Sequence, residues 1–178
     1  MKKYLLVVLC LLISTTSYSQ KVLGSFSLPE SEKFLDVKWD WSKAVIDKKL
    51  TEKEWAIVVG ENDWEQAKLE ALQLITREMN EKLENSRIMV IAPGSEKKTA
   101  CTLFITPISY NKKGFNVSQY ILINNQTGNQ VGICEIKGDG GKIGSVGNLL
   151  GDGYEESARK IGTILKKYNK VKKIGLIR

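Results

Sequence analysis

Three strand-like segments separated by short turns constrain the fold of this chain more than any other feature. They cover residues 101–110, 115–124 and 131–137, and they are rich in Ile, Val, Tyr, Phe and Thr, which favour β-structure. The connections, residues 111–114 and 125–130, consist mostly of turn formers such as Asn, Gly and Thr. Because connections this short join antiparallel neighbours, the three segments predict an antiparallel meander.

The turns also predict a register for this meander. If they set the pairing directly, Cys101 lies opposite Asn124, and Asn124 lies opposite Val131. Cys134 then falls three residues further along and on the other face of the sheet, so we expect two reduced or buried thiols and no disulfide. Pro107, inside the first segment, predicts a sheet edge or a β-bulge.

An amphipathic pattern predicts a long helix over about 63–85. Its apolar residues recur at three- and four-residue intervals, and the opposite face is charged. The preceding stretch, residues 51–59, has the composition of a strand. However, Thr51 and Glu54 match a capping box and Gly60 matches a helix stop, so we predict a short helix there.

The glycine-rich run before residue 154 raises the question of a phosphate-binding loop. Its spacing matches neither a P-loop nor a dinucleotide fingerprint, and it lacks the alternating oxygen ligands of a calcium loop. Instead, Gly147 and Gly151 keep in step with the apolar face of the helix behind them. We therefore predict a helix over about 145–168, capped by Ser145, with these glycines close to the sheet or to a binding partner. A loop as far as Asp152 is the alternative.

These elements together predict an α+β domain over residues 34–168. Alternation over residues 34–42 indicates a half-buried strand, and the apolar run at 86–92 indicates a buried one. We expect a mostly antiparallel sheet of about five strands, with the two main helices packed on one face. Residues 20–33 are expected to form an extended lead-in, and residues 169–178 a basic C-terminal tail.

The first residues match a secretory signal. A basic pair at residues 2–3 precedes an apolar core at residues 5–13, and small residues at 17 and 19 suit a cut before Gln20. The mature protein is therefore expected in the periplasm or associated with the outer envelope. A lipoprotein anchored at Cys10 is the less favoured alternative, because Leu rather than a small residue precedes it.

Charge and composition exclude several functions. The formal net charge is +7, but the last 13 residues hold six basic groups and no acid, so the body is close to neutral and a nucleic-acid partner is not expected. Contact of the tail with an anionic membrane surface is an open alternative to a solvated terminus. The sequence contains no histidine, which rules out histidine triads and histidine metal sites. We expect no cofactor, no metal and no enzyme activity.

Several motifs follow one another in a recognisable order: WDWSKAVID, the helix NDWEQAKLEALQLITREMNEKL, the hairpin end ILINNQTGNQVGICEI, the glycine patch and the helix GYEESARKIGTIL. In this order they resemble small exported envelope proteins of uncharacterised domain families in Gram-negative bacteria. These families are similar in outline to accessory domains of outer-membrane lipoproteins, such as peptidoglycan-synthase activators and the curli-secretion lipoprotein. The resemblance covers most of residues 34–168 and implies a binding or assembly module.

Two functions of different classes follow. The leading hypothesis is a non-enzymatic exported domain that binds another envelope component, most simply a protein, with Gly147 and Gly151 as contact residues. The alternative is a glycan or small-ligand binder that uses an aromatic strand face, Trp39 and Trp41, because aromatic rings stack on sugars. Burial of those two rings under the helix at 63–85 would remove the basis of the alternative.

Overall fold

The computed structural model describes residues 21–141 and 143–171, so the expected signal peptide and most of the expected tail lie outside the described residues. The described elements, in chain order, are β1 (Val22–Gly24), β2 (Phe34–Trp39), β3 (Val45–Ile46), α2 (Glu52–Val59), α3 (Glu61–Leu83), β4 (Met89–Val90), β5 (Cys101–Tyr110), β6 (Asn116–Asn124), β7 (Gln130–Gly138) and α4 (Val146–Tyr168). The α+β class is confirmed. None of these helices is long and apolar enough to cross a membrane.

The described strands form one mixed sheet in the order β1-β7-β6-β5-β2-β4, with β3 also paired to β5. The predicted meander of β5, β6 and β7 is present and antiparallel. However, β2 runs parallel to both β5 and β4, and β3 runs parallel to β5. The expectation of about five mostly antiparallel strands is therefore wrong: residues 21–141 and 143–171 contain seven strands in a mixed sheet. The physical reason is the crossover through α3, which makes β2 and β4 parallel neighbours.

The register of the meander agrees with the prediction in its first half. Cys101 lies opposite Asn124, and the register shifts between Pro107 and Ser109. Since β5 has neighbours on both sides, Pro107 marks a bulge and not an edge.

The second half of the register differs. A second shift between Leu122 and Ile123 pairs Ile123 with Gln130, so Asn124 does not lie opposite Val131. Cys134 pairs with Tyr120 and shares the face of Cys101, contrary to the prediction. Both thiols are nevertheless free and buried. Burial raises the pKa of Cys134 to about 12, which keeps it protonated and unreactive.

The helices begin and end close to where the sequence patterns placed them. In α2, the Thr51 hydroxyl accepts from the Glu54 amide while the Glu54 carboxylate accepts from the Thr51 amide, which confirms the capping box. Ser145 caps α4 by accepting from the Asn148 amide at 3.2 Å. The helix therefore includes Gly147, Gly151 and Gly153, and the alternative of a loop as far as Asp152 is wrong.

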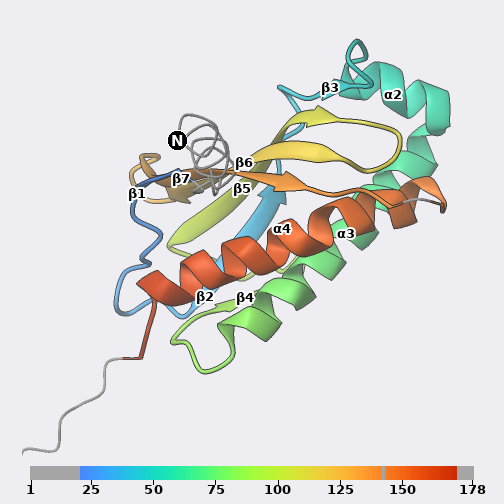
Figure 1. The fold of residues 1–178 in the computed structure, drawn as a ribbon. Helices are drawn as coiled ribbons and strands as arrows, with labels where there is room; N and C mark the ends of the chain where they lie inside the picture. Colours follow the sequence, from blue (N-terminus) through green and yellow to red (C-terminus); the bar gives the residue numbers. More distant parts are fainter. Residues whose placement is uncertain (1–20, 142, 172–178) are drawn as a thin grey trace, which may run out of the picture.

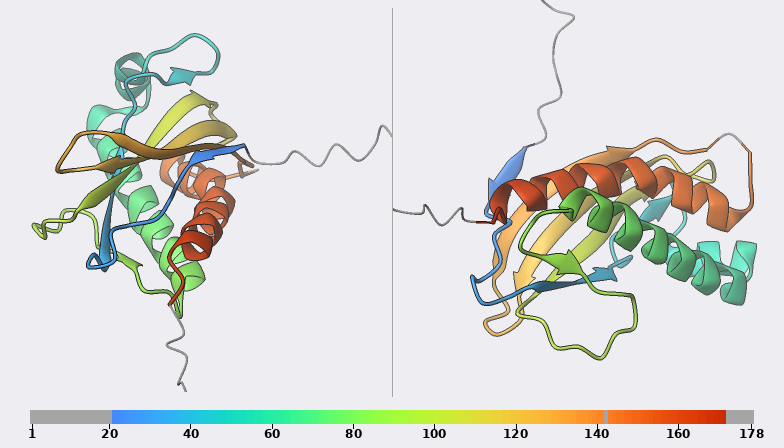
Figure 2. Two further views of the ribbon diagram at one scale, coloured as in Figure 1. Left: turned by 90° about the vertical axis from the view of Figure 1, so that its left-hand side faces the viewer. Right: turned by 90° about the horizontal axis from the view of Figure 1, so that it is seen from below.

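Helices α3 and α4 lie side by side on one face of the sheet (Figures 1 and 2), as predicted. The core fills the space between the two layers. It consists mainly of Leu35, Val37, Leu103, Ile105, Tyr120 and Leu122 from the sheet, Trp64, Ala67, Ile75 and Met79 from α3, and Tyr154, Ala158, Ile161 and Leu165 from α4. Phe26 and Leu28 are buried in the same core, so sheet and core begin before residue 34, within the segment expected to be a lead-in.

The glycines of α4 lie at close contacts with two different neighbours. A Cβ added at Gly151 would meet only the end of the Leu74 side chain of α3, at 3.1 Å. A Cβ at Gly162 would lie 2.9 Å from Lys82 Cβ and 3.2 Å from the Met79 carbonyl oxygen. A Cβ at Gly153 would collide with the Gly114 carbonyl oxygen in the β5–β6 turn. The small residues of α4 thus let its backbone approach both α3 and the sheet.

Gly151 and Gly153, two positions apart in α4, are expected to differ in their response to alanine. Gly153→Ala should lower the free energy of unfolding by about 2–3 kcal/mol, because the backbone of the turn must move. Gly151→Ala should stay within about 1 kcal/mol of the wild type or be more stable, because a better helix former offsets the contact with flexible Leu74. Urea unfolding of both variants measures this. Equal effects would contradict the close packing at Gly153.

Candidate functional site

The two tryptophans expected to form an aromatic platform lie under α3. Strand β2 ends at Trp39, and Trp41 is 7% exposed just beyond it. The Trp39 indole donates to the Lys68 carbonyl of α3 at 3.0 Å, and its ring meets Tyr154 edge-on at 4.8 Å. Trp41 packs against Trp64 at 5.0 Å. The rings therefore stabilise the contact between sheet and helices, and the aromatic face points into the molecule.

Gly147 and Gly151, the other expected contact residues, face α3 of the same chain. A Cβ at Gly147 would lie 3.7 Å from Ala67 Cβ and 3.1 Å from a Glu70 carboxylate oxygen. The tryptophan pair and the glycine pair are not brought together into one site. Each belongs to the packing between layers or between helices.

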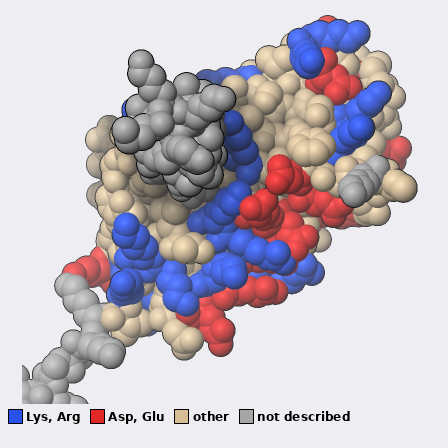
Figure 3. All heavy atoms as spheres, viewed as in Figure 1, with Lys and Arg blue, Asp and Glu red and all other residues tan. Residues whose placement is uncertain are grey.

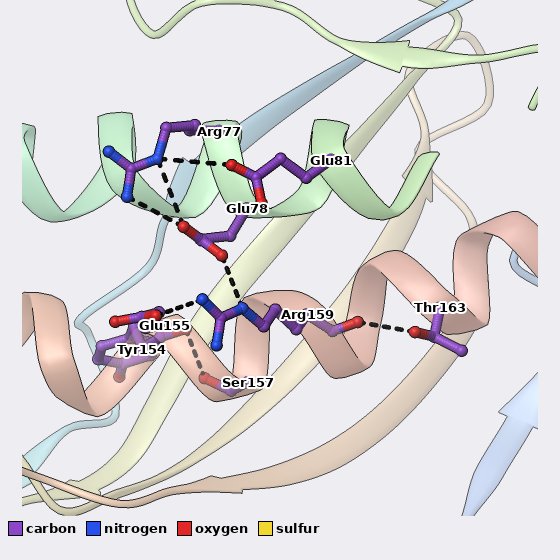
Figure 4. Close-up of polar contacts among 8 residues, drawn as sticks. All are labelled: Arg77, Glu78, Glu81, Tyr154, Glu155, Ser157, Arg159 and Thr163. Atoms are coloured by element: carbon purple, nitrogen blue, oxygen red, sulfur yellow. Dashed lines mark hydrogen bonds and ion pairs between the residues drawn. The ribbon is translucent and has the colours of Figure 1, made fainter. Parts of the chain in front are cut away.

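A buried carboxylate, Glu78, lies between α3 and α4 and is the first group to test for a catalytic role. Its side chain is 3% exposed and accepts from Arg159 at 2.7 Å and from Arg77 at 3.0 Å (Figure 4). Arg159 also pairs with Glu155 on its own helix. Burial alone would raise the pKa of Glu78, but the hydrogen bonds from both arginines outweigh it and hold the pKa below its usual value. Each of its carboxylate oxygens accepts from an arginine, so Glu78 joins the two helices.

The buried hydroxyls of Tyr154 and Ser118 also have a structural role, in a hydrogen-bonded chain that leads to α4. The Tyr154 and Ser118 hydroxyls share a hydrogen bond of 2.8 Å, and the Ser118 hydroxyl also donates to Asn116. The Asn116 amide in turn donates to the Gly153 carbonyl at 2.8 Å, where α4 meets the sheet. Burial raises the pKa of Tyr154 far above its ordinary value, so the phenol stays neutral. Within residues 21–141 and 143–171, no group of acidic and cysteine side chains could hold a metal ion.

The face of the sheet opposite α3 and α4 carries an apolar row. Strand pairing places Leu23 beside Ile133, Ile133 beside Ile121, and Ile121 beside Phe104, so the row crosses β1, β7, β6 and β5. These side chains alternate with the buried core residues and therefore point away from the helices. Leu23 is 52% exposed, and the other three are half-buried. Polar residues are usual on a sheet face turned to solvent. An apolar row on this face is therefore the surface feature that most strongly indicates a binding site.

A hollow lies on the same face of the sheet, beside the turn that joins β5 to β6. Its volume is about 350 Å³. Pairing across the sheet aligns Val45, Ser109, Val117 and Lys137 along it, and Phe115, which is 44% exposed, lies at its edge. We call the apolar row (Leu23, Phe104, Ile121, Ile133) together with this hollow the open face. It can bury apolar side chains of a partner, with polar groups at its border.

The open face was not predicted from the sequence, although a signal was present. In β6, residues 120–123 read Tyr-Ile-Leu-Ile, and in β5, residues 103–105 read Leu-Phe-Ile. Consecutive apolar residues in a strand indicate that both of its faces are apolar, whereas one-sided burial gives strict alternation.

Comparison with known proteins gives no family for this chain. No family model and no curated protein matches it. Two solved structures of the PelC dodecamer from Paraburkholderia phytofirmans, one of them a variant, are similar to it at 12% and 9% identity, with TM-scores of 0.44 and 0.41. Both cover 83% of this chain and 96% of the PelC chain. An uncharacterised protein is similar at 12% identity over 76% of this chain and 94% of its own, with a TM-score of 0.38. No function is inferred from likenesses this distant.

Glu78 is expected to contribute to stability in a pH-dependent way. Its folded pKa lies below the ordinary value of 4.5, so its contribution is present above about pH 4.5 and is lost as the pH falls through the folded pKa. Glu78→Gln should lower the free energy of unfolding by about 1–3 kcal/mol at pH 7, and the difference from the wild type should shrink in acid. Urea unfolding across pH 3–7 measures this.

Glu81→Gln is the matched control for this experiment. Glu81 is 60% exposed and lies 4.0 Å from Arg77, so its loss should cost less than about 0.5 kcal/mol at any pH. Equal losses in the two variants would contradict the role given to Glu78.

Proposed function

We propose that this chain is an exported, non-enzymatic domain of the cell envelope that binds another protein through its open face. The observation that carries this proposal is the apolar row from Leu23 to Phe104, which crosses four strands on a sheet face that α3 and α4 do not cover. Contiguous exposed apolar surface on a folded domain marks interaction sites.

The chemistry around the row favours a protein partner. Lys38 pairs with Phe104 at one end of the row, and Gln119 and Glu135 follow on the same face of β6 and β7. An apolar centre with polar residues at its border is the ordinary make-up of a protein interface. The hollow beside Val117 offers space for one or two side chains of the partner.

The other candidate functions lack a comparable observation. The glycan hypothesis depended on an exposed tryptophan face, and Trp39 and Trp41 pack against α3 and Tyr154 instead. An enzyme would need convergent titratable groups in a pocket. The buried groups described above, Glu78 and Tyr154, are occupied by contacts that join the two layers and the two helices.

In-cell cross-linking tests the proposal. The wild type is expected to capture a specific envelope protein. The double variant Phe104→Thr/Ile121→Thr keeps β-branched or β-favouring residues on the strands but removes the apolar centre of the open face. We expect it to capture at least about tenfold less, because truncation of residues at an interface centre commonly costs more than 1 kcal/mol each.

The matched control is Ile57→Thr/Val58→Thr on α2. These residues are 71% and 66% exposed and lie outside the open face, so their loss should leave capture unchanged. Unchanged capture by the open-face variant, or an equal loss in both variants, would rule the proposal out.

A further inference from the structure

Basic side chains gather where the α3–α4 pair ends. Lys82 lies in the last turn of α3, Lys166 and Lys167 lie in the last turn of α4, and Lys170 follows directly. Figure 3 shows basic side chains together at the end of α4, next to the point where the chain leaves the domain. We call these four residues the lysine cluster.

The lysine cluster is not neutralised within the described part of the chain. Further along the helices, cations are paired: Lys160 lies 2.8 Å from Glu156, and Lys68 lies 2.8 Å from Glu65. Among residues 21–141 and 143–171, no carboxylate forms an ion pair with any member of the lysine cluster. Its charge is therefore available to a partner outside the chain.

Three members of the cluster, Lys166, Lys167 and Lys170, border a hollow of about 720 Å³ between α4 and the segment after α3. Its two hydroxyl groups are already used: Ser86 donates to the Ile88 carbonyl, and Thr163 donates to the Arg159 carbonyl. The lysine ammonium groups and the side-chain amide of Asn85 are the donors that remain among its lining side chains. A pocket for one phosphate group presents several directed donors, whereas flexible lysines around a wide hollow suit an extended anionic surface.

An apolar component accompanies the charge. Val171 lines the same hollow and is 58% exposed. In the sequence that follows, Lys172 and Lys173 precede the apolar residues Ile174, Leu176 and Ile177. Mixed basic and apolar residues are typical of segments that bind anionic bilayer surfaces, where the bases meet headgroups and the apolar side chains enter the interface.

We propose that the lysine cluster docks the domain on a bilayer surface that contains anionic phospholipid. Each lysine near such a surface strengthens binding about fivefold. Because the cluster lies at the end of the helix layer and the open face lies on the sheet, this proposal does not depend on the protein-binding proposal, and the two tests can fail separately.

Vesicle co-sedimentation tests the proposal with the purified protein. Vesicles of equal parts phosphatidylcholine and phosphatidylglycerol should bind the wild type, and vesicles of phosphatidylcholine alone should not. The variant Lys166→Gln/Lys167→Gln/Lys170→Gln keeps good helix formers and should bind the anionic vesicles about 100-fold more weakly.

The matched control is Lys53→Gln/Lys112→Gln/Lys113→Gln, which removes three exposed charges at the other end of the molecule. It should bind within about threefold of the wild type, since charges beyond the Debye length are screened.

Three results would overturn the proposal. The first is an equal loss in the two triple variants, which would indicate a non-specific effect of net charge. The second is wild-type binding that does not differ between anionic and neutral vesicles. The third is displacement of the wild type from vesicles by inorganic phosphate at millimolar concentration, which would indicate a pocket for a single phosphate instead of a membrane-docking surface.

Discussion

The close approach of α4 to its neighbours is the constraint on which the rest of the structure depends. Gly151 and Gly162 bring α4 near α3, and Gly153 brings it near the β5–β6 turn. Packed in this way, the two helices cover one face of the sheet, enclose the core and align Arg159 with the buried carboxylate of Glu78. Helical glycines cost about 1 kcal/mol each relative to alanine, and the contact they permit offsets that cost.

A consequence of this two-layer arrangement is that the sheet has one covered and one uncovered face. Tyr120 of the covered face, Trp41 just beyond β2 and Tyr154 of α4 are buried between the sheet and the helices. The uncovered face holds the apolar row and the hollow beside Val117. The lysine cluster lies apart from both, at the end of the helices. A domain arranged in this way can present one apolar surface and one basic surface to different partners.

Much of this fold could be predicted from local sequence patterns, because interactions between residues close in sequence determine where its helices, caps and bulges form. The capping box at Thr51, the periodicity of α3 and α4, and the bulge at Pro107 each depend on residues close in sequence. The strands β1 and β3 span three and two residues, too few for a periodic pattern. The parallel half of the sheet was missed, although the order strand, long helix, strand before residue 93 is that of a parallel crossover. The open face depends on which layer covers the sheet, and only the packed structure decides that.

Maleimide labelling of Ile121→Cys tests most directly whether the uncovered sheet face binds a partner in the envelope. The two cysteines of the described residues, Cys101 and Cys134, are buried and free, and burial raises the pKa of Cys134 to about 12, so these two thiols should not be labelled. Cysteine at position 121 should react readily in the purified protein and at least about tenfold more slowly in intact envelopes, where the partner covers it, as expected for a site buried at an interface centre. A Lys53→Cys control on α2 should react equally in both. Equal labelling of position 121 in the two settings would contradict a bound open face.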